Sequence, residues 1–563
     1  MQSNRLRIKN KWWAWLLGAF FILILGATIF RMFYLQPWLQ KKLETVVTEH
    51  TAGLYSLSVR NIEVSLLGGS LILHNLRFTP DLKVWEKQKE KEPKAASPML
   101  GQIEAIQLQL QGLSYIDLLL QKSLQLDKIY LLEPQLVIYK MPVKPPPAKP
   151  LHQNLTNILK NLRIKEISIS KGHLIFKDYQ QEQNTMACEL TDFLVKDLRL
   201  DSLAYNDPNR FFYAQEVTIQ AEKADILLPK AFYRIKIAQV SLSSRAKTIA
   251  LSQTQLVPLY SAAGMSRKIN SALTQFNLTI PQVNLVGVNF SDFSRYGNIA
   301  LDLVKIQNPR LTTYKDALHF KDKVPQPLPH QIIQELKIGL SINKIQVTDL
   351  DIQYRELSRK TGKMALGTFQ NMNLILTNIS NDKNRMSAKT PAVLSGSLLI
   401  MGKTSLRGTI RYNLLSPNGY HTIRGTIGNG QPEILNPILE QDQLIRVKSG
   451  IVQKGHFRMV LTNTGAKGTM QLHYQNFKVD MLSKPKADSK DKKPKQSLGK
   501  KILSVFANKV VLNTDNVPEE NGFKTGEINT PYRQNRSVIT YWIDGLTSGI
   551  RSSLGLSSKV PTS

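Results

Sequence analysis

The sequence predicts a mainly β fold: an elongated, curled antiparallel sheet that forms a groove and is built from tandem repeats. One N-terminal transmembrane helix and a few short amphipathic helices complete the predicted architecture. Three observations support this fold class. Short runs that alternate apolar and polar residues, such as IQLQLQ at 106–111, follow one another after Gly53. An uncharged run of 19 residues precedes them, and two stretches of 29 residues, 112–140 and 287–315, align without a gap.

The composition is that of folded protein, with 42% hydrophobic and 21% charged residues in a chain of 563. This length exceeds what one compact core holds, so several domains or a repeat array are expected. Lys and Arg outnumber Asp and Glu by 74 to 42, and the net charge of +32 favours an anionic neighbour, either a membrane surface or nucleic acid. Cys188 is the only cysteine, which excludes an internal disulfide and leaves the redox compartment open.

The uncharged run, Trp12–Phe30, predicts a transmembrane anchor. At about 1.5 Å per residue it spans roughly 28 Å, close to the ~30 Å hydrocarbon core of a bilayer. A cleaved signal peptide is the alternative, but RMFYLQPW at 31–38 offers no small-residue cleavage site. The predicted anchor residues are Trp12, Trp13, Trp15, Leu16, Leu17, Phe20, Phe21, Ile22, Leu23, Ile24, Leu25, Ile29 and Phe30.

Basic residues before the anchor set its predicted orientation. They place the N-terminus in the cytoplasm and the bulk of the chain across the membrane, because cytoplasmic segments carry an excess of Lys and Arg. These topology charges are Arg5, Arg7, Lys9 and Lys11.

The two aligned stretches belong to a longer duplication, Gln102–Tyr179 and Asn277–Leu357. The stretches lie 175 residues apart and share eight of 29 positions, among them Gly112/Gly287 and Pro134/Pro309. In both copies a proline-rich linker leads into a short apolar helix and then directly into a strand. Tandem units of this kind predict a quasi-one-dimensional β architecture.

The helical runs that follow the two linkers have similar apolar stripes. The first stripe is Leu151, Leu155, Ile158, Leu159 and Leu162, and the second is Ile333, Leu336 and Leu340.

The residue pattern changes in the C-terminal third of the chain. Glycine-punctuated strands from about residue 391 predict an antiparallel β region, and KPKADSKDKKPKQ at 484–496 predicts a solvated, disordered loop. The predicted organisation is a cytoplasmic tail (1–11), the anchor (12–30), a juxtamembrane helix (31–52), a first β-groove unit (53–275), a second β-groove unit (276–390), the C-terminal β region (391–483), the Lys-rich loop (484–500) and a C-terminal segment with an amphipathic helix (501–563).

The amphipathic helix near the C-terminus is predicted from apolar residues that recur every four positions. Two placements remain open for it: a cap on the open end of the sheet, or a helix on a membrane surface. Its apolar residues are Val538, Trp542, Leu546, Ile550 and Leu554.

An alternating strand has one apolar side, and the sequence leaves two uses for it. The sheet could close into a sandwich filled by its own side chains, or it could leave an apolar gutter open to a ligand such as an acyl chain. The candidate groove residues are Ile106, Leu108, Leu110, Val283, Leu285, Ile345 and Val347.

Catalytic and metal-binding patterns are not found. The nine histidines have no H-x-x-x-H spacing, and GTIGNG at 425–430 lacks the spacing of a phosphate loop and is interpreted as a hairpin turn. The recurring pairs Asp117/Asp292 and Asp127/Asp302 are interpreted as turn or cap residues. We therefore expect no enzyme activity, no cofactor and no metal. Nucleic acid is also disfavoured, because the basic residues are spread along the chain and the protein carries an anchor.

The layout resembles the AsmA-like family of diderm bacteria, which is related to the TamB superfamily. The residues that carry the resemblance are VRNIEVSLLGGSLILHNLRFTPD at 59–81, AIQLQLQGLSYIDLLLQKSLQLDKIYLLEPQLVIY at 105–139, LNP at 435–437 and SG at 449–450.

The resemblance implies a single-pass inner-membrane protein with its bulk in the periplasm. It implies a β-groove that binds phospholipid, or conducts it between membranes, and that supports outer-membrane homeostasis. The alternative is a structural or assembly factor whose sheets are closed on themselves and whose partner is an outer-membrane or envelope protein. The oligomeric state stays open.

Overall fold

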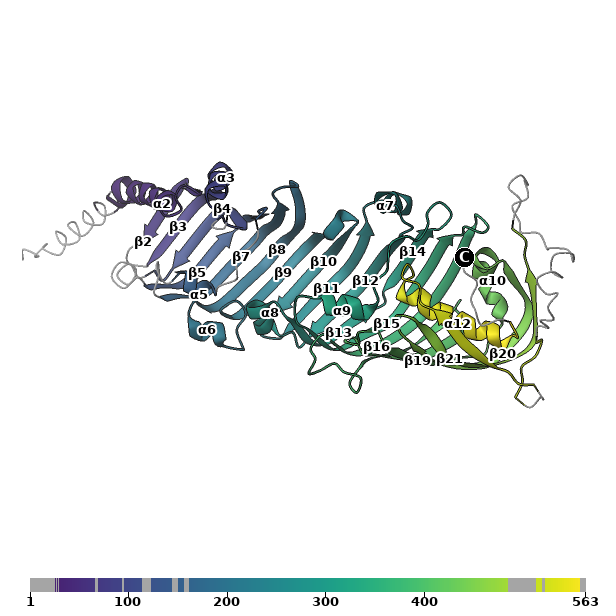
Figure 1. The fold of residues 1–563 in the computed structure, drawn as a ribbon. Helices are drawn as coiled ribbons and strands as arrows, with labels where there is room; N and C mark the ends of the chain where they lie inside the picture. The colour runs from purple at the N-terminus through teal and green to yellow at the C-terminus, as the bar shows by residue number, and fades with distance from the viewer. Residues whose placement is uncertain are drawn as a thin grey trace, which may run out of the picture. The chain divides into compact units, whose positions relative to one another are not determined.

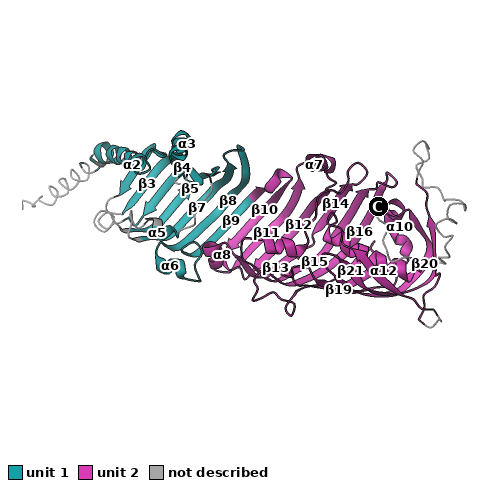
Figure 2. Ribbon diagram, in the orientation of Figure 1, with its two compact units in different colours: residues 1–222 teal, residues 223–563 magenta. Residues whose placement is uncertain are grey.

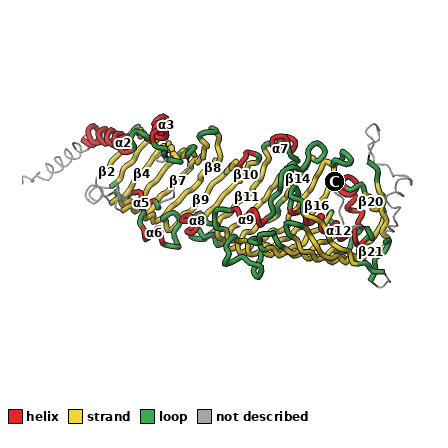
Figure 3. Tube along the Cα trace, viewed as in Figure 1, coloured by secondary structure: helices red, strands yellow, loops and turns green. Residues whose placement is uncertain are grey.

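The computed structural model describes residues 26, 28, 30–65, 69–93, 96–113, 123–143, 150–155, 161–484, 513–518 and 522–556. In this part of the chain 22 strands belong to one mixed sheet, so the mainly β prediction is confirmed. Figure 3 shows that strands dominate and that short helices occupy the connections between them. The sheet is not purely antiparallel as predicted, because four of its strand pairs run parallel.

Several predicted segments lie outside the described residues. They are the tail (1–11), all of the anchor except residues 26, 28 and 30, residues 485–500 of the lysine-rich loop, and Asp117. Among the described helices, none combines the length and the apolarity needed to cross a membrane.

The chain divides into two compact units, residues 1–222 and 223–563 (Figure 2). The first unit contains a π-helical turn η1 (Arg31–Leu35), four described α-helices and the strands from β1 onward (Figure 1). Its helices are α2 (Gln36–His50), α3 (Leu82–Lys91), α5 (Leu151–Leu155) and α6 (Ser202–Asn206). Its strands are β1 (Tyr55–Ser58), β2 (Asn61–Ser65), β3 (Ser70–Pro80), β4 (Met99–Gln111), β5 (Ser123–Leu132), β6 (Gln135–Lys140), β7 (Asn161–Asp178) and β8 (Gln183–Arg199), and β9 (Ala214–Leu227) contains the unit boundary.

The second unit holds the remaining elements. Its strands are β10 (Tyr233–Ser243), β11 (Thr248–Pro258), β12 (Thr274–Val286), β13 (Ile299–Gln307), β14 (Arg310–Asp316), β15 (Leu340–Leu357), β16 (Met364–Ser380), β17 (Ala392–Ile400), β18 (Thr404–Tyr412), β19 (His421–Ile427), β20 (Ile445–Leu461), β21 (Gly465–Met481) and β22 (Thr525–Pro531). Its helices are η2 (Pro229–Ala231), α7 (Ala262–Ile269), α8 (Phe290–Tyr296), α9 (Pro329–Glu335), η3 (Pro432–Leu435), α10 (Asn436–Asp442) and α12 (Val538–Ser553).

The two copies of the duplication have the same strand pairing. In the first copy, β5 and β6 pair antiparallel with β4 and parallel with β7. In the second copy, β13 and β14 pair in the same way with β12 and β15. Even the register agrees, because Gln107 faces Leu132 in the first copy and Gln282 faces Gln307 in the second. The duplication seen in the sequence is therefore a duplication of structure.

Recurring turn residues hold this geometry in both copies. Gly112 and Gly287 have φ of 74° and 71°, a region that favours glycine. A Cβ atom on either glycine would lie within 2.3 Å of the Oδ2 atom of Asp127 or 2.0 Å of that of Asp302, so each aspartate covers its glycine. Asp127 and Asp302 themselves lie within β5 and β13, so their interpretation as turn or cap residues is wrong, and they instead cover the glycine turns from the neighbouring strand.

The partners of these aspartates also correspond. Asp127 forms an ion pair with Lys165 at 2.6 Å, and Asp302 accepts a hydrogen bond from the Asn343 amide at 2.8 Å. Asp292 lies in the first turn of α8, and the side chain that caps this helix is Asn289, which accepts from the Asp292 N–H.

Three other local predictions are wrong. The apolar stripes after the linkers are not helical to their last residues, because Leu162 lies in β7 and Leu340 opens β15, while Ile158 and Leu159 lie outside the described residues. α9 ends at Glu335, and Leu336 is already extended with ψ of 126°. GTIGNG at 425–430 is not a tight hairpin turn, because the chain passes through η3 and α10 before it returns as β20. The glycines at 425–430 indicated that the strand ends there, but they could not show how long the connection between β19 and β20 is.

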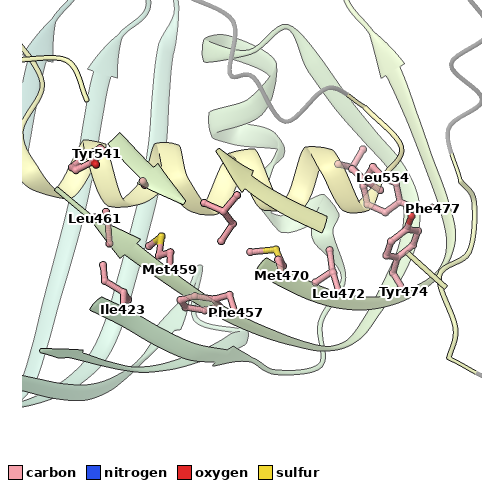
Figure 4. Packing of buried hydrophobic residues seen from close by; sticks show 13 residues of the cluster. Ile423, Phe457, Met459, Leu461, Met470, Leu472, Tyr474, Phe477, Tyr541 and Leu554 are labelled. Carbon is pink, nitrogen blue, oxygen red and sulfur yellow. The ribbon is translucent and has the colours of Figure 1, made fainter. Parts of the chain in front are cut away.

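Helices cover the apolar side of the sheet at several places. In the first unit, α2 packs Leu39 and Leu43 on a cluster that includes Ile62 and Leu73, and α3 buries Trp85 in a neighbouring cluster. In the second unit the largest cluster lies between β18–β22 and the helices α10 and α12. Figure 4 shows this cluster with α12 lying over the strands.

Candidate functional site

An unbroken row of apolar side chains crosses ten strands of the second unit. Residues that face each other in neighbouring strands point to the same side of a sheet. Following the register from β10 to β20 therefore collects one continuous line on one face, which we call row A. Row A consists of Leu242, Ile249, Leu285, Val304, Ile345, Leu376, Leu394, Ile410, Ile423 and Met459.

A second row, row B, runs beside row A on the same strands. Row B begins as Val240, Leu251, Val283, Ile306, Val347 and Leu374 and continues through three glycines, Gly396, Gly408 and Gly425, to Phe457. Two of the glycines are roofed by neighbours, since a Cβ would lie 2.4 Å from Leu374 Cδ2 at Gly396 and 2.5 Å from Phe457 Cζ at Gly425.

The first unit has its own versions of both rows across β2, β3, β4, β5, β7 and β8. Their ends on β2 and β3 are buried beneath α2, whereas their middle members are half-buried. The first version is Val64, Leu71, Leu110, Ile129, Ile167 and Val195, and the second is Ile62, Leu73, Leu108, Leu131, Ile169 and Phe193.

Six of the seven candidate groove residues lie in these rows. Leu108 and Leu110 belong to the rows of the first unit. Val283, Leu285, Ile345 and Val347 belong to rows A and B of the second unit. Ile106 does not join them. It lies opposite Asn75, where the pairing of β3 with β4 is interrupted, and 47% of it is exposed.

Row A ends in the closed part of the second unit. Its last members, Ile423 and Met459, are 7% and 3% exposed and belong to the cluster beneath α12. Figure 4 shows both side chains between the strands and this helix. By contrast, Leu242, Ile249, Leu285 and Val304 at the other end are half-buried. The apolar face thus passes from a partly exposed region into a self-filled core.

α12 docks on the sheet through small residues. Gly545, Ser548, Gly549 and Ser552 are buried on its inner face. Ser548 Oγ accepts from the Asn529 N–H and Ser552 Oγ from the Glu527 N–H, both at 2.9 Å. These N–H groups belong to β22, which pairs with β21 and with no other strand in the described part of the chain, so the serines satisfy backbone donors on the strand's other side.

The predicted apolar residues of α12 do not form this inner face. Trp542, Leu546 and Ile550 are partly buried at the margin of the cluster, and Leu554 is buried just beyond the end of the helix. Val538 is half-buried at the first position. The helix therefore lies against the sheet, but sequence reasoning missed the glycines and serines that make the contact. The signal was present as small residues at helical spacing, which carry no hydrophobic periodicity.

Hydrogen bonds join two loops at one edge of the second unit, residues 322–326 and residues 532–535. Gln326 lies between β14 and α9, and its N–H donates to the Gln534 carbonyl at 2.7 Å. Tyr532 Oη donates to the Gln326 carbonyl at 3.2 Å, and Asn535 Nδ2 donates to the Asp322 carbonyl at 3.1 Å. We call these contacts the rim clasp. They join residues more than 200 positions apart and hold the start of α12 in place.

A buried polar chain also connects α12 to the strands. Trp542 Nε1 donates to His421 Nε2 at 2.9 Å, so His421 must carry its proton on Nδ1, which donates to the Gly419 carbonyl at 2.7 Å. The His421 ring stacks on Tyr412 at 4.2 Å, and the Tyr412 hydroxyl bonds His330 Nδ1 at 3.0 Å. This arrangement requires a neutral His421.

Acid is expected to loosen α12. Burial lowers the pKa of His421 to about 4, and burial also lowers the pKa of His330. Because the folded-state pKa lies below the unfolded value, the contribution to stability is complete above pH ~6.5 and is lost as pH falls towards 4. The contribution of His421 alone is about 3 kcal/mol. Hydrogen-exchange protection factors of residues 538–553, measured between pH 7 and 4.5, should fall accordingly, and His421→Phe should flatten the profile. A wild-type profile that is already flat would contradict the assignment.

The described residues offer no metal centre, since no group of three or more His, Cys, Asp or Glu side chains among them is arranged to hold an ion. Cys188 is buried, and its pKa is raised by that burial, so its thiol is poorly suited to act as a nucleophile.

Comparisons with known proteins add nothing to this picture: the chain matches no protein-family model, and no curated protein matches it either. The resemblance described above therefore remains an expectation drawn from the residues. The apolar rows are the candidate site that the geometry itself defines.

Proposed function

We propose that this protein is held in a membrane by Trp12–Phe30 and binds phospholipid acyl chains along rows A and B. The observation that carries the proposal is the continuity of row A, which crosses ten strands of the second unit without a polar side chain. Each methylene that leaves water contributes about 0.8 kcal/mol and needs no polar partner. Repetition of the sheet unit lengthens the apolar surface, and a long apolar surface suits an acyl chain that moves along it.

In this proposal the chain is not an enzyme and uses no cofactor. It is a single-pass inner-membrane protein with a cytoplasmic N-terminus and a periplasmic bulk, and it supports outer-membrane homeostasis by holding or conducting phospholipid between the two membranes. The duplicated apolar rows support binding along a length rather than at one point.

A second candidate is a structural or assembly factor that acts through an outer-membrane or envelope protein. The self-filled cluster beneath α12 favours it, because that part of the apolar face is already occupied by the protein's own side chains. The two candidates differ in whether the half-buried part of row A takes up a ligand.

Lipid that co-purifies with the full chain tests the proposal. Leu285→Asp combined with Ile345→Asp places two carboxylates in row A, and we expect bound phospholipid to fall about tenfold, because contact with an acyl chain cannot offset the cost of burying a charge. The matched control is Asn284→Asp combined with Gln346→Asp, which puts the same charges on the opposite face of the same strands. Mass spectrometry of the detergent-extracted protein gives the amount of lipid.

The control variant should keep its lipid within about twofold of the wild type. Equal loss from both variants would show that row A is not the binding surface. A wild-type protein without phospholipid would refute lipid binding altogether, and reproducible crosslinking to one envelope protein would then favour the assembly role.

A further inference from the structure

Four arginines gather on the side of the sheet opposite the apolar rows. Arg407 and Arg411 lie in β18, Arg424 in β19 and Arg458 in β20, and all four are exposed. Their neighbours in the chain, such as Ile410, Ile423 and Phe457, belong to or pack against the cluster beneath α12. Because side chains alternate between the two faces of a strand, the arginines point away from that cluster. We call them the arginine patch.

The register places these charges side by side. Arg424 stands directly opposite Arg458, and on its other side it faces Thr409, which has Arg407 and Arg411 two positions away on either side. Such diagonal neighbours are only about 7–8 Å apart, and like charges directly opposite each other destabilise a sheet. The fold therefore keeps an arrangement that is unfavourable in the isolated protein.

No carboxylate in the described part of the chain relieves this repulsion by forming an ion pair with any of the four arginines. Their side chains make one polar contact with the described residues, from Arg458 Nε to Thr469 Oγ1 at 3.3 Å. The acid in the outward rows that contain these arginines is Glu527 in β22, which stands opposite Thr469 and is exposed.

The outer face of the first unit shows how the same sheet normally treats its charges. Lys128 pairs with Glu166 at 2.7 Å, Glu166 stands opposite Lys196, and Lys196 pairs with Glu216 at 3.6 Å. Charges of opposite sign thus alternate across neighbouring strands there. The arginine patch departs from this pattern and is left with an uncompensated positive charge.

We propose that the arginine patch docks on an anionic lipid surface. A guanidinium group matches a phosphate with two parallel hydrogen bonds, and the interleaved Thr409, Thr422 and Thr426 add hydroxyl donors. Several phosphates in one lipid layer would meet several arginines on one face of the sheet. Headgroup phosphates would also remove the Arg424–Arg458 repulsion.

The make-up of the patch argues against other anionic partners. The outward rows across β17–β22 that contain the arginines otherwise consist of Ser, Thr, Val, His, Gln, Lys, Glu and Asn and include no Phe, Tyr or Trp. Single-stranded nucleic acid is bound with aromatic stacking, and protein interfaces are rich in aromatic residues and depleted of charge at their centre. Neither description fits. The proposal is independent of the apolar rows, which lie on the other face.

A vesicle-capture experiment on the full chain tests the proposal. The protein is reconstituted into neutral phosphatidylcholine nanodiscs, immobilised, and exposed to fluorescent vesicles made of phosphatidylcholine with or without phosphatidylglycerol. We expect the wild type to retain the anionic vesicles and Arg424→Glu combined with Arg458→Glu to retain about tenfold fewer. Added salt should release the vesicles, because it screens the attraction.

The matched control is Lys236→Glu combined with Lys305→Glu, which makes the same change of charge at exposed lysines on β10 and β13, outside the arginine patch. This control should retain nearly as many vesicles as the wild type. A milder variant, Arg424→Gln, relieves the like-charge contact and should unfold no more readily than the wild type while retaining fewer vesicles. That pair of readouts separates docking from a structural role.

Three results would overturn the proposal. They are equal losses in the patch and control variants, equal retention of neutral and anionic vesicles by the wild type, and retention of neither. Displacement by polyglutamate but not by free phosphatidylglycerol vesicles would assign the patch to an acidic protein instead. None of these outcomes depends on whether phospholipid co-purifies with row A, so the two proposals can fail separately.

Discussion

Gly526→Ala is expected to release α12 from the sheet and to lower the free energy of unfolding by about 3 kcal/mol. A Cβ atom on Gly526 would lie 2.4 Å from the Gly549 carbonyl oxygen and 2.8 Å from the Ser553 nitrogen. Both are backbone atoms of α12 or its end, so no side-chain rotation can make room and the helix itself must move. The displacement also breaks the hydrogen bonds from β22 to Ser548 and Ser552.

Gly545→Ala, in the same interface, provides the control. Its new Cβ would meet Met459 Sδ at 2.8 Å, near the end of a flexible side chain that can turn aside. Alanine also favours a helix over glycine by up to about 1 kcal/mol, so this variant should be neutral or slightly stabilising. Urea unfolding gives the free energies, and hydrogen exchange of residues 538–553 reports on docking. Similar behaviour of the two variants would show that close backbone approach does not hold α12.

Gly287→Ala should destabilise the second unit by about 2–3 kcal/mol, through two separate effects. Gly287 has φ of 71°, which a residue with a side chain adopts at a cost of roughly 1–2 kcal/mol. In addition, its Cβ would lie 2.0 Å from Asp302 Oδ2. Thermal or urea unfolding of the full chain measures the sum.

Gly297 isolates the first of these effects. It has φ of 70°, and a methyl group added there would meet no described neighbour within 4 Å, so Gly297→Ala carries the backbone cost alone. The second effect is isolated by a double-mutant cycle with Asp302→Ala, in which the double variant should lose less than the sum of the two single losses. Strict additivity would mean that Asp302 does not cover Gly287 in solution. The same cycle at Gly112 and Asp127 tests the first copy.

Much of the fold can be predicted from the sequence because the sheet repeats itself. Period-two alternation identifies strands, and the gapless match of 112–140 with 287–315 predicts that both copies pair their strands alike. Alternation does not say which strand is the neighbour, however. The parallel pairing of β13 and β14 with β15 requires a connection that returns the chain to the end of the sheet where β14 begins, and nothing in the strand sequences marks that return.

The candidate site likewise contains residues that the sequence predicts and an arrangement that it does not. Leu108, Leu285 and Ile345 could be found because apolar residues alternate with polar ones in their strands. The continuity of row A could not, because it depends on the register of nine strand pairs. The arginine patch was hidden for the same reason, since Arg424 and Arg458 become neighbours only when β19 and β20 are aligned. The inner face of α12 could not be predicted, because its glycine and serine residues add nothing to a periodic pattern of apolar residues.

The rim clasp determines when the second unit can be completed during synthesis. In the described part of the chain each strand pairs with a strand that is next or next but one in sequence, so the sheet can form as the chain emerges. The clasp joins residues 322–326 to 532–535, and α12 follows it, so neither can form until residues 532–553 have left the ribosome. Until then the apolar side of β18–β21 has no α12 to cover it. A nascent chain that has reached β21 therefore presents the surface that holdase chaperones recognise, and slower elongation between β21 and α12 should prolong their binding.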